Sequence, residues 1–204
     1  MRTIVVFLLL TGIGSISWLI LAKPSKKQEE AKSQAIVVSR YSTAFNASIS
    51  SLLDDYYQLN ELFVKWDSVK VNMQATELQK RVEGLSIAEI EKDTIIYLTA
   101  QSFLENAKND AATMATEKNI QPQREALNSF TDNLYQFLNT VKYDKEKLYL
   151  QQCSMAFDET RPALWISQKE EIRNPYMGLY HPKYDKAMLA CGEIKKVIDN
   201  TNHK

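Results

Sequence analysis

The sequence predicts a mainly α protein: an antiparallel helical bundle with a small C-terminal cap that contains a short two-stranded hairpin. Three observations indicate this fold class. Apolar residues recur at steps of three and four through most of the chain before Val141. Only five glycines and five prolines occur in 204 residues, which favours long helices over a strand-rich fold. After Val141 the pattern changes to short runs of β-prone residues.

Residues 1–22 have the pattern of an export signal. Arg2 precedes an uninterrupted stretch of apolar and small residues, Ile4–Ala22. This stretch is longer than the ~7–15 residues of a cleaved signal core and close to the ~20 residues that span a bilayer. No convincing small-x-small cleavage site ends it. We therefore expect a signal-anchor in an inner membrane, with a cleaved signal peptide as the alternative, and a periplasmic location from about Lys23 onward in both cases.

The charge balance argues against nucleic acid as a partner. Without residues 1–22, which contain Arg2 and no acid, the chain has 24 basic and 25 acidic residues and a net charge of −1. Nucleic-acid binding depends on clustered Lys and Arg, and no such cluster is present. The remaining length is enough for one domain of ordinary size with its own core.

Residues 23–33 are rich in Lys, Gln, Glu and Ser and predict a solvated linker, and residues 34–142 predict the bundle. The first helix of the bundle is indicated by a sustained apolar stripe. Its members are Val38, Tyr41, Phe45, Ile49, Leu52, Tyr56, Leu59 and Phe63. A second, shorter helix is predicted over about Val69–Val82, and Gly84 ends it. Its candidate core residues are Met73, Leu78 and Val82.

Two further helices complete the predicted bundle. Ser86 and Glu89 have capping-box spacing and predict a helix that runs from Ser86 to about Lys118. Its expected core residues are Ile87, Ile90, Leu98, Ala111 and Ala115. Pro122 fits the first turn of a fourth helix, where its missing N–H costs nothing. The core stripe of that helix is Leu127, Phe130, Leu134, Phe137 and Val141. Amphipathic helices with short connections pack as an antiparallel bundle.

Residues 143–204 predict a cap that packs on the bundle. The runs Leu148–Gln152 and Ala163–Ile166 lie on either side of the Asp158–Pro162 turn, so we expect them to pair as the hairpin. A two-stranded hairpin is marginal alone and needs the bundle to pack on.

Two more helical signals occur within the cap. Ser167 and Glu170 repeat the capping-box spacing and predict a helix start, which Asn174-Pro175 would end. A last helix is predicted over Met188–Ile198.

Signals for catalysis are weak, and the sequence predicts a protein that is not an enzyme. It contains no Gly-rich phosphate loop, no G-x-S-x-G and no H-E-x-x-H motif. Its two histidines are His181, in a loop, and His203, in the C-terminal tail. The carboxylates are scattered along helices, as is typical of a solvated surface.

The two cysteines, Cys153 and Cys191, admit two interpretations. In an exported chain a pair of cysteines usually forms a disulfide. Closing a loop of 38 residues would stabilise the fold by about 4 kcal/mol in the chain-entropy model. The opposed interpretation is a soft-metal site, because thiolates and thioethers select Cu(I) and similar ions. The two are mutually exclusive for these sulfur atoms.

The metal interpretation follows from the spacing of cysteines and methionines. Cys153 and Met155 lie two residues apart and would share a face on a strand. Met188 and Cys191 lie three apart and would share a face on a helix. The candidate ligands are Cys153, Met155, Met188 and Cys191, with His181 and Met177 on the intervening loop.

The order of these residues resembles a bacterial domain of unknown function, found alone in small exported proteins and appended to periplasmic adaptor (membrane-fusion) subunits of heavy-metal efflux pumps. The resemblance rests on Cys153, Met155, Trp165, Ile166, Ser167, Glu171, Ile172, Asn174, Pro175, Tyr176, Gly178, Met188, Cys191 and Gly192. This chain has Ser154 where that domain usually has Pro, and it inserts Leu179–Ala187 before Met188. The resemblance implies an accessory role in Cu(I) or Ag(I) handling and an efflux adaptor as partner. The disulfide and the metal site both remain open.

Overall fold

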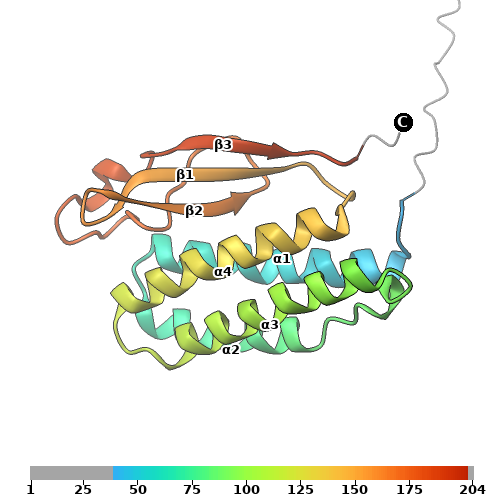
Figure 1. Ribbon diagram of the computed structural model, residues 1–204. Helices are drawn as coiled ribbons and strands as arrows, with labels where there is room; N and C mark the ends of the chain where they lie inside the picture. Colours follow the sequence, from blue (N-terminus) through green and yellow to red (C-terminus); the bar gives the residue numbers. More distant parts are fainter. Residues whose placement is uncertain (1–38, 202–204) are drawn as a thin grey trace, which may run out of the picture. The chain divides into compact units, whose positions relative to one another are not determined.

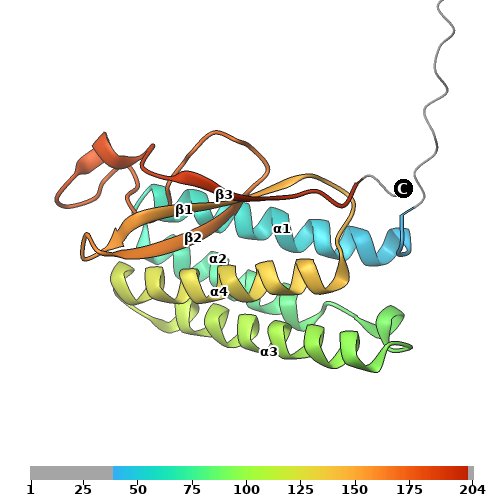
Figure 2. The same ribbon diagram turned by 45° about the horizontal axis from the view of Figure 1, so that its top comes forward.

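The structure, a computed structural model, describes residues 39–201, so the predicted export segment and linker lie outside it. Its elements are α1 (Thr43–Val64), α2 (Ser68–Glu83), α3 (Thr94–Thr116), α4 (Ile120–Val141), β1 (Leu148–Phe157), β2 (Arg161–Ser167) and β3 (Glu193–Ile198). Figures 1 and 2 show an antiparallel sheet that lies over α1 and α4, with α3 on the far side of the bundle. The predicted mainly α fold with a C-terminal strand cap is confirmed. Within the described range, no helix is long and apolar enough to cross a bilayer.

The predicted stripes of the first and fourth helices form the centre of the core. From Phe45 to Phe63 the stripe of α1 is buried, and so is the whole stripe of α4. Tyr56 links three elements. Its ring stacks on Phe130 of α4 at 5.8 Å, and its hydroxyl pairs with Thr131 Oγ1 at 2.7 Å and accepts from the Ile166 N–H of β2 at 3.1 Å. This buried hydroxyl fixes the sheet on the bundle.

Two of the residues predicted to be buried in the second and third helices are exposed. Met73 is 67% exposed and Leu98 is 56% exposed. Instead, α2 and α3 bury faces that contain Ala75, Ala100, Ala107 and Ala111. On α3, three of the five buried residues are alanines, whose small side chains let the helix backbones approach closely, and Leu98 is left outside. On α2, the predicted Leu78 and Val82 are buried beside Ala75, and only Met73 turns outward.

The capping box predicted at Ser86 is wrong. Residues Ala88–Ile90 form only a short 3₁₀ turn, and α3 begins at Thr94 with Asp93 as its N-cap, accepting from the Ile96 N–H at 3.1 Å. The Glu89 carboxylate does not reach back to Ser86. It accepts from the N–H and the hydroxyl of Ser42, the N-cap of α1, both at 2.6 Å. A carboxylate at a helix N-terminus is stabilised by the helix dipole, which explains this partner.

We expect Asp93→Ala to lower the free energy of unfolding by about 1 kcal/mol, because it leaves an N-terminal N–H of α3 without an acceptor. Ser86→Ala is the matched control and should change stability by less than about 0.5 kcal/mol. Urea denaturation of the two variants measures both values. An equal loss of stability in Ser86→Ala would instead support Ser86 as the N-cap, as the sequence predicted.

The cap is a three-stranded sheet in the order β2-β1-β3, so the predicted hairpin is correct and a third strand joins it. Residues Tyr149 and Ser167 face each other across β1 and β2, and Leu148 faces Ile198 across β1 and β3. The helix predicted over Met188–Ile198 is therefore wrong.

The physical reasons for this third strand are local. Gly192 has φ of 152°, which no helix accommodates, and only a 3₁₀ turn, Asp185–Met188, precedes it. The following Ile194, Val197 and Ile198 are β-branched, and their strand satisfies the backbone groups along the otherwise open edge of β1.

The helix predicted to start at Ser167 is also absent. Ser167 ends β2, and its hydroxyl accepts from the Lys169 N–H at 2.9 Å in a local turn. The Gln151 side chain of β1, which is fully buried, donates to the carbonyls of Lys169, Glu170 and Glu171 at 2.9–3.3 Å. These side-chain hydrogen bonds replace the helical ones.

Candidate functional site

The connection between β2 and β3 carries most of the cysteine signature and is anchored on α1. The Arg173 guanidinium binds the Glu61 carboxylate through two contacts of 2.5 and 2.8 Å. The Leu179 N–H donates to the Val64 carbonyl at the end of α1 at 2.7 Å. Gly178 makes this approach feasible, because its φ is 52° and a Cβ there would lie 2.7 Å from the Val64 oxygen. The sequence motif is thus a fixed loop.

Asn174 is the centre of this loop and is fully buried. Its Oδ1 accepts from the N–H groups of Tyr176 and Met177 at 2.8 and 3.1 Å, which closes the Asn-Pro-Tyr turn. Its Nδ2 donates to the Cys191 carbonyl at 2.7 Å, and its backbone N–H donates to the Leu189 carbonyl at 2.9 Å. One amide therefore holds the turn and positions Cys191.

The two cysteines meet between β1 and the segment that precedes β3. Cys153 is fully buried on β1, Cys191 is partly exposed, and their sulfur atoms lie 3.0 Å apart as free thiols. Burial, and then the contact with Cys153, raises the pKa of Cys191 to about 11. The Cys191 thiol is therefore protonated at neutral pH. The structure brings together two residues that are 38 positions apart in the sequence.

Three of the other predicted ligands, Met155, Met177 and His181, line a surface depression that neither cysteine lines. Met188 ends the 3₁₀ turn Asp185–Met188, and the Cys191 N–H donates to the Met188 carbonyl at 3.0 Å, so the two residues share a tight turn and not the predicted helix. Within residues 39–201, no group of three or more His, Cys, Asp and Glu side chains is placed to hold a metal ion.

The spacing of the two sulfurs also bears on the choice between disulfide and metal. A disulfide requires about 2.0 Å between sulfurs, so closure needs a movement of roughly 1 Å. Two thiolates bound tetrahedrally to one metal ion at about 2.3 Å each would lie about 3.8 Å apart. The sulfurs would have to separate for metal binding and approach for a disulfide.

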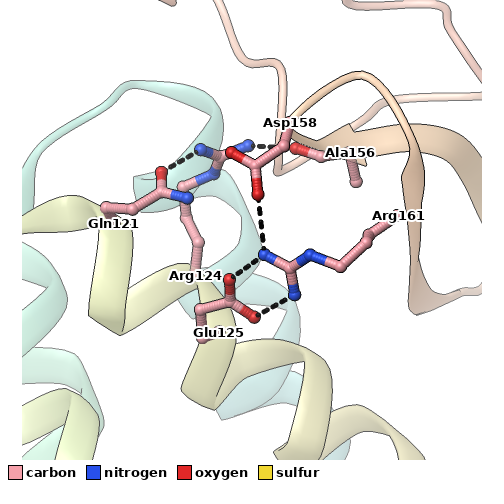
Figure 3. A network of polar contacts seen from close by, with 6 residues as sticks. All are labelled: Gln121, Arg124, Glu125, Ala156, Asp158 and Arg161. Atoms are coloured by element: carbon pink, nitrogen blue, oxygen red, sulfur yellow. Dashed lines mark hydrogen bonds and ion pairs between the residues drawn. The ribbon is translucent and has the colours of Figure 1, made fainter.

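Arg124 of α4 also lines the depression that contains Met155 and His181, and it belongs to no known sequence motif. Its only sequence signal is its phase, three residues before Leu127 on the core stripe. Arg124 is 3% exposed, and Figure 3 shows its guanidinium between α4 and the end of β1. It donates to Gln121 Oε1 at 2.5 Å and to the Ala156 carbonyl at 2.8 Å.

Aromatic rings cover the rest of the Arg124 guanidinium. Its carbon lies 4.9 Å from the ring centre of Trp66 and 5.3 Å from that of Phe157. Burial lowers the pKa of Arg124 to about 10. The pKa of the neighbouring His181 is also lowered, first by burial and then by the Arg124 charge.

Fold and site together define a four-helix domain with a three-stranded cap, in which a buried asparagine positions a cysteine pair. Residues 52–146 match a protein family described as "Protein of unknown function (DUF3347)". The match begins within α1, covers α2 to α4 and stops before the cysteine signature begins. No curated protein matches the chain, and no solved structure matches it.

Proposed function

We propose that this chain is an exported, non-enzymatic accessory module whose cap is cross-linked by a disulfide between Cys153 and Cys191. The observation that carries the proposal is the 3.0 Å contact between their sulfur atoms. The contact requires a specific fold, because the Asn174 side chain holds Cys191 through its carbonyl at 2.7 Å. A disulfide would connect the central strand β1 to the segment that leads into the edge strand β3.

The setting of this disulfide is consistent with export and with a protein partner. Residues 1–22 have the pattern of an export signal, and export would place the cysteines in the periplasm, where disulfides form and persist. The resemblance of the cysteine signature to a domain appended to periplasmic adaptors of efflux pumps makes such an adaptor the first partner to test. The role would then be structural, in which the module contacts the adaptor.

A second candidate function is binding or transfer of Cu(I) or Ag(I) by the reduced cysteines. The meeting of two thiols supports it, since thiolates select soft ions. Metal ligation requires the thiolate, so binding would displace the proton that the raised pKa of Cys191 keeps on its sulfur.

Free-thiol counting on protein purified from the periplasm separates the two functions. Alkylation without reductant, followed by mass spectrometry, should find no free thiol and one intramolecular bridge. Two free thiols, together with a 1:1 complex in an anaerobic Cu(I) titration, would contradict the disulfide and support the metal site.

The titration has a matched set of methionine variants. If the metal site exists, Met155→Ala and Met188→Ala weaken Cu(I) binding. Met73→Ala is the control, because Met73 is 67% exposed on α2 and is not among the predicted metal ligands.

A further inference from the structure

Among residues 39–201, the buried Arg124 guanidinium has no acidic partner. Its two hydrogen bonds go to neutral oxygens, Gln121 Oε1 and the Ala156 carbonyl. Its Nε is buried and has no hydrogen-bond partner. Burying a charge without an opposite charge is costly, and the rings of Trp66 and Phe157 compensate only in part. The buried positive charge of Arg124 is therefore not neutralised by a negative charge.

The nearby carboxylates are engaged by other residues. Arg161 binds Glu125 at 2.7 Å and Asp158 at 3.1 Å, as Figure 3 shows. Glu159 is paired with Lys183 and accepts from the Tyr184 hydroxyl at 2.5 Å. Every acid that borders the depression thus has a cationic partner, and Arg124 has none among them.

A second hydrogen-bond donor of the depression comes from His181. Its Nδ1 accepts from the backbone N–H groups of Lys183 and Tyr184 at 3.2 and 3.3 Å. The neutral imidazole must then carry its proton on Nε2. With Nδ1 engaged by two N–H groups and the proton on Nε2, neither ring nitrogen has a free lone pair for a metal ion. His181 is thus set as a donor, and the adjacent Arg124 charge repels cations.

We propose that this depression is a binding site for a small organic carboxylate with an apolar body. The Arg124 guanidinium binds the carboxylate, and His181 Nε2–H donates to it. The depression has a volume of about 310 Å³, which is the size of a small-molecule site. The side chains of Met155, Met177 and Tyr184 also line it and provide the apolar surface. The planar guanidinium fork matches a carboxylate better than a spherical anion.

Isothermal titration calorimetry of the purified protein with benzoate tests this site. We expect benzoate to bind, acetate to bind more weakly because it has no apolar body, and benzamide not to bind because it has no charge. Equal binding of benzamide and benzoate, or no binding of benzoate, would overturn the proposal. Tighter binding of an N-acetylated tetrapeptide that ends in Phe with a free carboxylate would overturn the assignment to a free small molecule.

Variants locate the binding site. Arg124→Gln should weaken benzoate binding by at least about tenfold, since a hydrogen bond to a charged group is lost. His181 is partly exposed, so its replacement should disturb the fold little, and His181→Ala should weaken benzoate binding by about fivefold. His181→Gln should restore binding, because the Gln side chain keeps a hydrogen-bond donor. Arg81→Gln is the control; Arg81 pairs with Asp55 and lines a different depression. If Arg124→Gln fails to fold, the two His181 variants still decide the matter, and unchanged binding in His181→Ala would contradict the role of this donor.

Discussion

Reduction of the proposed Cys153–Cys191 disulfide is expected to lower the free energy of unfolding by about 4 kcal/mol. The cross-link closes a loop of 38 residues, and the chain-entropy model gives this magnitude for that length. The loop contains β2 and the whole connection to β3, which the Arg173–Glu61 ion pair and the Leu179 N–H anchor to α1. Without the cross-link, β3 is an edge strand whose side chains are mostly exposed, so its detachment should be the first step of unfolding.

Urea denaturation of the oxidised protein, with and without a phosphine reductant, measures this difference. The double variant Cys153→Ser and Cys191→Ser is the control, because its stability should not respond to reductant. Hydrogen exchange should show that β3 amides lose protection on reduction while α1 and α4 amides keep it. A reductant effect below about 1 kcal/mol in the oxidised protein would contradict a stabilising role of the disulfide.

The bundle was more predictable from sequence than the cap, and the reason is the range of the interactions. The stripe from Phe45 to Phe63 is a local periodic signal, and one buried face per helix is enough to satisfy it. Met73 and Leu98 show where such a signal fails: hydrophobicity alone ranks them above alanine, but α2 buries Ala75 and α3 buries an alanine-rich face in their place. Boundaries failed for a related reason, since Glu89 found its partner in Ser42, 47 residues away.

The cap depends on long-range pairing that local patterns do not contain. Residues 193–198 form a strand because β1 offers them an edge, and Gln151 holds residues 169–171 by three hydrogen bonds from the middle of β1. For Cys153 and Cys191 the sequence left a disulfide and a metal site open, and both require that the two sulfurs meet, which only folding shows. Arg124 is the opposite case: a charged residue in phase with a core stripe is a signal that a search for known motifs passes over.

Replacing Asn174 by Ala should lower the free energy of unfolding by about 3–5 kcal/mol. The change removes three hydrogen bonds of one buried side chain, and it leaves the N–H groups of Tyr176 and Met177 and the Cys191 carbonyl without partners. Each unsatisfied buried group costs about 1–3 kcal/mol, although water that enters the space recovers a part. Asn200→Ala is the matched control, because Asn200 makes one hydrogen bond, to the Tyr143 carbonyl at 3.0 Å, and should cost about 1 kcal/mol.

The Asn174 variant also tests the link between the turn and the cysteine pair. If Asn174 positions Cys191, the cost of Asn174→Ala should be smaller in a background where both cysteines are Ser, because the cross-link no longer depends on the turn. A double-mutant cycle measures this coupling, and residues that share a structural unit typically couple by 0.5–3 kcal/mol. Additive effects would mean that the turn and the cysteine pair stabilise the cap independently. A coupling energy in this range would mean that the Asn-Pro-Tyr motif and the two cysteines form one structural unit, in which the buried Asn174 amide positions Cys191 against Cys153.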